Sequence, residues 1–171
     1  ADGGQTLETG TYTVEVTDNT SGVTVESSEI TVSEADDEEA SFADGVITDE
    51  RGDILEATIE LEETDTATLS FGSSDDGVVA NATVEDDNGD DEVTVYINTY
   101  NFDDANDNIF NIDSDSDDEI LGQDQTSAAL NELIDAGDYD FEVVAGDESG
   151  NLAADPVSDS DDVATVTLNE R

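Results

Sequence analysis

Net charge is the feature of this sequence that most constrains its folding. Its 171 residues contain 49 Asp and Glu, against only two basic residues, Arg51 and Arg171, so the formal net charge is −47. On one globule of this mass, neighbouring charges would lie roughly 13 Å apart. Their summed repulsion at 0.1 M salt approaches ~10 kcal/mol, which rivals the stability of a whole domain, about 5–15 kcal/mol.

Dissolved salt removes most of this repulsion. At 1 M salt the Debye length is about 3 Å, and the same sum falls well below ~1 kcal/mol. Such a charge is also typical of a disordered acidic chain. Disorder is disfavoured here because the hydrophobic residues, 35% of the chain, fall in short alternating runs and there is a single Pro. The sequence therefore predicts a folded protein built for molar salt.

Alternating apolar residues predict an all-β fold. Period-two alternation is typical of half-buried antiparallel strands. The pattern is clearest in four runs: Ile54–Leu61, Thr66–Phe71, Val78–Val84 and Glu92–Tyr100. We expect each of these runs to be a strand.

The segments between these runs have patterns of their own. Asn88-Gly89 predicts a tight hairpin turn, because both residues tolerate positive φ, and it should join the strands around Val84 and Val93. Apolar residues at helical spacing in residues 126–136 predict one short helix that ends before Gly137. Residues 101–125 and 145–161 are Asp-rich and aperiodic, so we expect loops there.

An internal repeat predicts how the chain is divided. Leu7–Val16 aligns with Ile134–Val143 at an offset of 127 residues, and the closing strands Ser28–Val32 and Val163–Leu168 follow in turn. This offset suits one β-sandwich domain. We therefore expect residues 1–35 to be the C-terminal hairpin of a preceding domain, residues 36–171 to be one complete sandwich, and the chain to be an excerpt of a longer protein.

Two tyrosines mark the repeat. Tyr12 and Tyr139 each follow a Gly by two residues, ahead of an alternating strand. This spacing is similar to the tyrosine corner of immunoglobulin-like sandwiches, in which the phenol bonds back to upstream backbone. A core aromatic residue without that bond accounts for the pattern equally well.

Missing residue types exclude most catalytic chemistry. The chain has no Lys, His or Cys, so nucleophilic triads and thiol catalysis are absent. Its charge repels nucleic acid. Carboxylate pairs at glycosidase distances arise by chance among 49 acids, and no Trp accompanies them. We predict no enzyme and no catalytic residues. No apolar run approaches the ~20 residues of a membrane span.

Clustered carboxylates instead favour cation binding. Hard ions such as Ca²⁺ and Mg²⁺ take oxygen ligands, and alternate acids in a loop can converge on one ion. The candidate clusters are Asp113, Asp115, Asp117, Asp118 and Glu119; Asp103, Asp104, Asn106, Asp107 and Asn108; and Asp86, Asn88, Asp90 and Glu92. None matches a full EF-hand. A solvated run of charge is the alternative for each cluster, and a structural Ca²⁺ or Mg²⁺ is the expected cofactor.

Three further motifs concern the surface. Two N-glycosylation sequons begin at Asn19, in a predicted hairpin loop, and at Asn81, inside a predicted strand. Asn81 would be usable only if its side of the strand faces solvent. Arg51-Gly52-Asp53 spells an integrin-binding tripeptide, but it is better interpreted as an acidic turn before the strand at Ile54.

A set of motifs between residues 51 and 139 points to a family. The motifs are Arg51-Gly52-Asp53-Ile54, Thr64-Asp65-Thr66-Ala67-Thr68-Leu69, Phe71-Gly72, Asn81-Ala82-Thr83-Val84, Asn88-Gly89-Asp90-Asp91-Glu92-Val93-Thr94-Val95, Asn98-Thr99-Tyr100 and Ala136-Gly137-Asp138-Tyr139. Together they resemble the recurring immunoglobulin-like module of surface-layer glycoproteins from halophilic archaea. The resemblance covers about residues 40–171.

This resemblance implies a secreted, N-glycosylated, extracellular protein of tandem immunoglobulin-like antiparallel β-sandwiches. Such proteins self-associate into a two-dimensional lattice around the cell, with divalent cations supporting the assembly. Two points depart from the family: its Thr-rich stalk and membrane anchor are not in these residues, and the insertion at 101–125 is long. We expect a structural component of a cell-surface layer. The alternative is a binding, adhesion or accessory module of another secreted haloarchaeal surface protein or filament.

Overall fold

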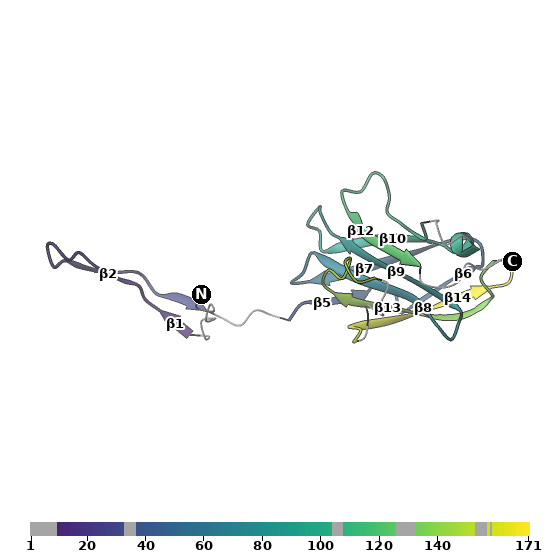
Figure 1. The fold of residues 1–171 in the computed structure, drawn as a ribbon, viewed down its shortest axis with the longest axis horizontal. Helices are drawn as coiled ribbons and strands as arrows, with labels where there is room; N and C mark the ends of the chain where they lie inside the picture. The colour runs from purple at the N-terminus through teal and green to yellow at the C-terminus, as the bar shows by residue number, and fades with distance from the viewer. Residues whose placement is uncertain (1–9, 33–36, 104–107, 126–132, 153–156, 158) are drawn as a thin grey trace. The chain divides into compact units, whose positions relative to one another are not determined.

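The computed structural model of the chain describes residues 10–32, 37–103, 108–125, 133–152, 157 and 159–171. Its contacts divide the chain into two units, Ala1–Asp37 and Glu38–Arg171, called unit 1 and unit 2 below. The described residues of both units form β-strands, with one short 3₁₀ helix in unit 2 (Figure 1).

Unit 1 is a long antiparallel hairpin. β1 (Gly10–Tyr12) pairs with β4 (Ile30–Val32), and β2 (Glu15–Thr17) pairs with β3 (Thr24–Glu26). A turn joins β2 to β3, where the backbone N–H of Gly22 donates to the carbonyl of residue 18 (2.7 Å). The predicted hairpin in this part of the chain is therefore present.

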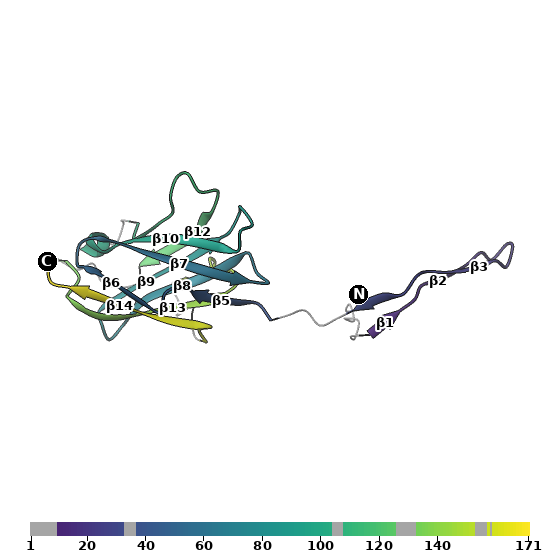
Figure 2. The ribbon, with the colours of Figure 1, turned by 180° about the vertical axis from the view of Figure 1, so that it is seen from behind.

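Unit 2 is a sandwich of two sheets (Figures 1 and 2). One sheet has four strands in the order β11-β10-β7-β5, and the other has six in the order β12-β9-β8-β13-β14-β6. Every pairing is antiparallel except that of β14 with β6. The elements are β5 (Glu39–Phe42), β6 (Val46–Glu50), β7 (Ile54–Glu62), β8 (Thr66–Ser73), β9 (Val78–Glu85), β10 (Glu92–Asn98), η1 (Thr99–Asp103), β11 (Phe110–Asn111), β12 (Glu119–Gln125), β13 (Gly137–Ala145) and β14 (Asp162–Asn169).

The predicted all-β sandwich is confirmed. The four alternating runs of the sequence are the strands β7, β8, β9 and β10, although the last ends at Asn98 and continues as the 3₁₀ helix η1. Residues 51–53 form the predicted turn: Gly52 has a φ of +85° and donates its N–H to the hydroxyl of Thr99 (2.8 Å). The immunoglobulin-like subtype stays a prediction.

The core lies between the two sheets and is filled by alternate residues of the strands. All five Phe side chains of the chain are buried: Phe42, Phe71, Phe102, Phe110 and Phe141. Their rings, with that of Tyr139, form one connected cluster with centroid distances of 4.7 to 6.3 Å. Contacts of this kind add to the burial of apolar area.

The prediction of loops over residues 101–125 is wrong for part of that stretch. It contains β11 and the seven-residue β12, which pairs with β9 along the edge of the six-stranded sheet. The strand escaped prediction because its residues are half-buried on both faces, and because its register shifts between Ile120 and Gly122. Both features erase the period-two pattern.

The predicted tight hairpin at Asn88-Gly89 is also wrong. β9 and β10 belong to different sheets, so residues 86–91, the crossover segment, pass from one layer to the other. The positive-φ residues in it are Gly89 (φ 75°) and Asp91 (φ 64°) rather than Asn88 and Gly89. The segment does join the strands that contain Val84 and Val93, and Gly89 has the expected positive φ, but tertiary packing places those two strands in different sheets.

The predicted helix falls mostly outside the described residues. Residues 126–132 are not described, and residues 133–136 are irregular rather than helical. Residue Ile134 of this stretch is buried in the core. In the described ranges, no helix is long and apolar enough to cross a membrane.

Candidate functional site

Two of the three predicted acidic clusters meet in unit 2. The crossover segment 86–91 lies beside the loop 112–118, and the side-chain amide of Asn88 donates a hydrogen bond to Oδ1 of Asp118 (2.8 Å). The two segments border a cavity of about 280 Å³, to which β7 and β10 also contribute. Its acidic lining residues are Asp90, Glu92, Asp113 and Asp118.

Negative charges near this cavity act on the pKa of a tyrosine that lines it. The charge of Glu56 raises the pKa of Tyr96 above its usual 10.0, and partial desolvation and the charge of Asp113 act in the same direction. Negative charges have this effect because they oppose formation of the phenolate. The same field attracts cations.

The cavity does not contain a formed metal site. Within the part of the chain that the structure describes, no three acidic side chains are grouped so that they could hold a metal ion. Both carboxylate oxygens of Asp118 already accept hydrogen bonds, from Asn88 and from the hydroxyl of Ser116 (2.7 Å). The arrangement therefore offers cations a negative surface rather than a set of ligands.

Asp86, one of the predicted ligands, has a structural role in the crossover segment. Its side chain is buried, and its carboxylate accepts hydrogen bonds from the backbone N–H groups of Asn88 (3.1 Å), Gly89 (2.7 Å) and Asp91 (2.8 Å). These donors use three of the about four lone-pair sites of the carboxylate. The Asp86 carboxylate thus fixes the backbone conformation of the crossover segment.

The remaining predicted ligands that the structure describes do not converge. Asp115, Asp117 and Glu119 are exposed, and Asn108 is exposed beyond the 3₁₀ helix. Asp104, Asn106 and Asp107 lie outside the described residues, as does the side chain of Asp103. The cluster around residues 103–108 is therefore not placed, and the cluster at 113–119 is divided between the cavity and solvent.

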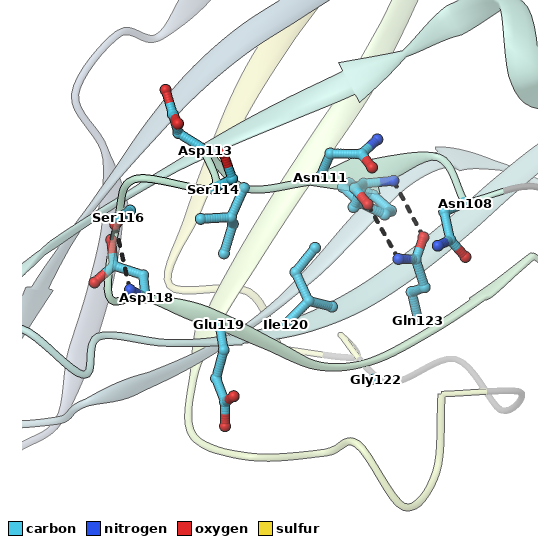
Figure 3. A pocket seen from close by; sticks show the side chains of 12 residues that line it. Asn108, Asn111, Asp113, Ser114, Ser116, Asp118, Glu119, Ile120, Gly122 and Gln123 are labelled. Carbon is cyan, nitrogen blue, oxygen red and sulfur yellow. Dashed lines mark hydrogen bonds between the residues drawn. The ribbon is translucent and has the colours of Figure 1, made fainter.

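Gln123 joins the two sheets on one side of the sandwich, a role with no sequence signal. From β12 its Oε1 accepts the backbone N–H groups of Ile109 and Phe110 (both 3.1 Å), and its Nε2 donates to the carbonyl of Phe110 (3.0 Å). Figure 3 shows the two bonds to Phe110, beside a cavity of about 450 Å³ between β12 and the loop 112–118. The Gln123 side chain thus bonds to the edge of β11 that faces away from β10, where no strand of the described residues pairs with it.

Two carboxylates join the sheets on the other side. Oδ2 of Asp161 accepts the N–H groups of Ala40 (3.2 Å) and Ala145 (2.8 Å), and Oδ2 of Asp162 accepts that of Phe42 (3.0 Å). Ala40 and Phe42 lie on β5, the edge strand of the four-stranded sheet. An open edge invites pairing with another chain, and these carboxylates occupy two of its donors.

The sequon at Asn19 lies on an exposed turn of unit 1. Both carboxylate oxygens of Asp18 shape this turn, one by accepting the N–H of Thr20 (2.8 Å) and the other the hydroxyl of Ser21 (2.7 Å). These hydrogen bonds, that of Thr20 first, hold the pKa of Asp18 below its usual value. Asn19 itself is exposed, so a glycan on it meets no steric obstacle within the described hairpin.

The sequon at Asn81 is inaccessible in the folded chain. Asn81 is 1% exposed on β9, and its Nδ2, the atom that would carry a glycan, donates to the carbonyl of Leu152 (2.8 Å). Leu152 is itself buried, so this face of the strand is covered rather than open to solvent, a point that the sequence alone left open. The predicted glycan at Asn81 does not fit this fold.

Tyr139 makes the bond expected of a tyrosine corner. Its hydroxyl donates to the carbonyl of Asp135 (2.8 Å), four residues upstream. Desolvation, and after it the charges of Asp135 and Asp76, raise the pKa of Tyr139 above 10.0. Of the two alternatives that the sequence left open, the bonded tyrosine is the one present, with its ring in the core and its hydroxyl fixing the start of β13.

Comparisons with known proteins identify relatives of the chain. A family model described as a domain of unknown function (DUF7827) matches residues 32–146. The chain is 44% identical over 94% of its length to a cell surface glycoprotein of Haloferax gibbonsii, of which it covers 19%. It is 37% and 35% identical over 98% of its length to cell surface glycoproteins 1 and 2 of Haloarcula hispanica, covering 18% of each. No solved structure matches it.

Proposed function

The chain belongs to the DUF7827 family and is homologous to one segment of haloarchaeal cell surface glycoproteins, and we propose that it is a structural module of a cell-surface layer. Its location is the extracellular surface of the cell. The observation that carries the proposal is the 44% identity to a cell surface glycoprotein across 94% of the chain.

The construction of unit 2 supports a structural role. Its five Phe side chains are buried, and both lateral sides of the sandwich are tied by side-chain hydrogen bonds, through Gln123 on one side and Asp161 and Asp162 on the other. Its surface carries a high density of carboxylates that molar salt screens. A sandwich tied on both sides in this way suits a spacer that must hold its shape outside the cell.

We propose further that the protein self-associates into a two-dimensional lattice with the help of divalent cations. Carboxylates on facing molecules repel each other, and a bound Ca²⁺ or Mg²⁺ would turn that repulsion into a bridge. The cavity lined by Asp90, Glu92, Asp113 and Asp118 is the first position to test, because predicted ligands from two clusters border it.

Electron microscopy and sedimentation of the full-length protein in molar KCl test the proposed assembly. With calcium present, sheets or rings are expected, and a chelator should dissolve them. A full-length protein that stays monomeric under all these conditions would show that the proposed lattice role is wrong.

The contribution of the cavity needs its own measurement. We expect calcium to raise the thermal midpoint of the chain in molar KCl, and we expect the joint substitution Asp113→Asn and Asp118→Asn to reduce that rise. Asp117→Asn, an exposed neighbour, is the matched control. An equal calcium effect in all three proteins would place cation binding elsewhere on the surface.

A further inference from the structure

We propose that Asn88 is a site of spontaneous deamidation whose reaction is held back by the folded crossover segment. Asn88 is the one Asn of the chain that a Gly follows. In this dipeptide the backbone nitrogen of Gly89 can attack the side-chain carbonyl carbon of Asn88, because glycine has no side chain to hinder the approach. The reaction needs only water besides the chain, and it is independent of the lattice assembly and cation binding proposed above.

Deamidation replaces the amide of Asn88 by a carboxylate in two steps. In the first step the nitrogen of Gly89 gives its proton to a base in solution and forms a bond to Cγ of Asn88, while the bond from Cγ to Nδ2 breaks. The departing nitrogen takes a proton from water and leaves as ammonia. In the second step water opens the resulting cyclic imide, which gives aspartate or, by opening at the other carbonyl, isoaspartate. The sum is amide plus water to carboxylate plus ammonium.

Both residues of the dipeptide lie open to solvent. Asn88 and Gly89 are exposed, and a Cβ at Gly89 would meet open space. Water and hydroxide therefore reach the reacting atoms in the folded chain. Since burial does not protect this dipeptide, its protection comes from the hydrogen bonds that the two residues make.

The first of these hydrogen bonds holds the attacking group. The N–H of Gly89 donates to Oδ1 of Asp86 (2.7 Å), a buried side chain. Attack requires this N–H to lose its proton, and the carboxylate opposes the loss because a second negative charge would form beside it. Asp86 also accepts the N–H groups of Asn88 (3.1 Å) and Asp91 (2.8 Å), so the segment has to open before the nitrogen is released.

The second hydrogen bond holds the leaving group. Nδ2 of Asn88 donates to Oδ1 of Asp118 (2.8 Å), and closure of the imide ring removes this nitrogen. Asp118 is itself fixed: its Oδ2 accepts the hydroxyl of Ser116 (2.7 Å), and its N–H donates to the same hydroxyl (3.2 Å) (Figure 3). The attacking and the leaving group are thus both held in bonds that the reaction must break.

Deamidation would replace the link between the two segments by a repulsion. The amide of Asn88 is a donor, whereas the carboxylate that replaces it only accepts. Two carboxylates at this distance repel each other, and the same cavity already holds Asp90, Glu92 and Asp113. The bond to Asp118 cannot form again, so a deamidated crossover segment opens more readily than the original one.

Deamidation rates measured by peptide mass spectrometry test the protection. The folded 171-residue chain is incubated in molar KCl beside a synthetic peptide of residues 84–92, which supplies the rate of the unfolded segment in the same buffer. Asn88 should react at least ~10-fold more slowly in the folded chain, because the segment must first open. Equal rates in the chain and in the peptide would overturn the proposal.

Two variants assign the protection to its carboxylates. Asp86→Ala frees the N–H of Gly89, and Asp118→Ala frees the amide of Asn88, so each should raise the rate in the folded chain. The matched controls are Asp87→Ala and Asp117→Ala, exposed neighbours that remove the same charge and should leave the rate unchanged. Either carboxylate variant reacting no faster than its control would contradict the proposed mechanism.

The folded state of each variant is checked by circular dichroism in molar KCl. If Asp118→Ala does not fold, Ser116→Ala takes its place, because it removes the hydroxyl that fixes Asp118 and leaves the carboxylate present. Its rate should also exceed that of the wild type. A folded Ser116→Ala chain that reacts at the wild-type rate would count against the role of Asp118.

Substitutions at Asn88 separate the lost link from the added charge. Asn88→Asp and Asn88→Ala both remove the donor, but only the first places a carboxylate beside Asp118. Asn88→Asp should therefore have the lower thermal midpoint in molar KCl, and the difference should shrink when Asp118→Ala is added to both. Equal midpoints in the two single variants would show that the repulsion inferred for the deamidated segment is wrong.

Discussion

At the scale of the residue, a few polar side chains take the place of missing backbone partners. Gln123 satisfies two N–H groups and one carbonyl of the segment at β11, and Asp161 satisfies one N–H of β5 and one of β13. A side-chain oxygen can do this because it accepts two hydrogen bonds at once. Asp86 uses the same property to hold the crossover segment.

Replacing Gln123 tests how strongly one side chain ties the sheets together. Gln123→Ala removes three hydrogen bonds to half-buried backbone groups, so the free energy of unfolding should fall by about 2 kcal/mol. Asp124→Ala, at an exposed position of the same strand, should change it by less than about 0.5 kcal/mol. Urea unfolding in molar KCl measures both. Equal losses in the two variants would mean that Gln123 is not a special link.

Tyr139 should make stability depend on pH in the alkaline range. Its folded-state pKa lies above 10.0, so the stabilisation is complete below about pH 10 and is lost as the pH rises through the folded-state pKa. Tyr139→Phe removes the bond to the carbonyl of Asp135 and should cost about 1 kcal/mol at neutral pH.

Urea midpoints between pH 8 and pH 11 measure this effect. The gap between the wild type and Tyr139→Phe should narrow above pH 10, whereas Tyr100→Phe, at an exposed position, should follow the wild type at every pH. A gap that stays constant across the range would show that the phenol is not desolvated in the fold.

At the scale of the element, backbone conformation decides which substitutions a strand or turn accepts. The β8–β9 hairpin contains two glycines in the left-handed region, Gly72 (φ 74°) and Gly77 (φ 76°). A Cβ at Gly72 would overlap the carbonyl oxygen of Val78, whereas a Cβ at Gly77 would meet open space. A residue with a Cβ would therefore be strained at both positions, but only at Gly72 would the Cβ also collide with a backbone atom.

Alanine substitutions at these glycines separate strain from collision. Gly77→Ala should cost about 1 kcal/mol, the penalty for a Cβ in the left-handed region. Gly72→Ala should cost about 3 kcal/mol or more, because the strand pair must also open. Unfolding midpoints of the two variants are compared directly. Similar losses at both positions would indicate that the hairpin relaxes around Gly72.

Removing the carboxylates that cover β5 should expose a sheet edge. The double substitution Asp161→Ala and Asp162→Ala leaves the N–H groups of Ala40 and Phe42 without acceptors, so we expect lower stability and association through β5. The double substitution to Asn keeps an acceptor oxygen at each position and should stay monomeric. Sedimentation in molar KCl distinguishes them, and a monomeric Ala variant would show that the edge is protected by other means.

At the scale of the whole molecule, repulsion among carboxylates should decide at which salt concentrations the fold is stable. The two arginines make ion pairs, Arg51 with Glu170 (2.9 Å) and Arg171 with Asp53 (3.4 Å). Such exposed pairs are worth about 0–1 kcal/mol each and cannot offset a charge of −47. Screening by dissolved salt is the effect that remains to lower the repulsion among the carboxylates.

Dilution of salt should therefore unfold the chain. Below about 0.5 M salt, and without divalent cations, we expect loss of the β-sheet signal in circular dichroism, with recovery in molar KCl. Sucrose, which favours burial without screening charge, should restore much less structure. Native signal retained at low salt would show that the repulsion is smaller than the charge implies.

Local patterns in the sequence accounted for most of the strands. Alternation located β7 to β10, and the repeated Gly-x-Tyr motif located both closing hairpins. These predictions succeeded because period-two burial is a property of short segments. β12 was missed because an edge strand with a register shift has no such period.

The sequence by itself determined the acidic character of the protein, its all-β fold and its family resemblance, since each follows from composition or local order. Tertiary structure alone decided that the Asn88-Gly89 segment crosses between sheets, that Asn81 is buried, and that Asn88 meets Asp118 thirty positions along the chain. It also decided which of 49 similar acids tie the sheets together. The physical reason is that a carboxylate acquires its role from the donors around it, and those donors come from distant strands.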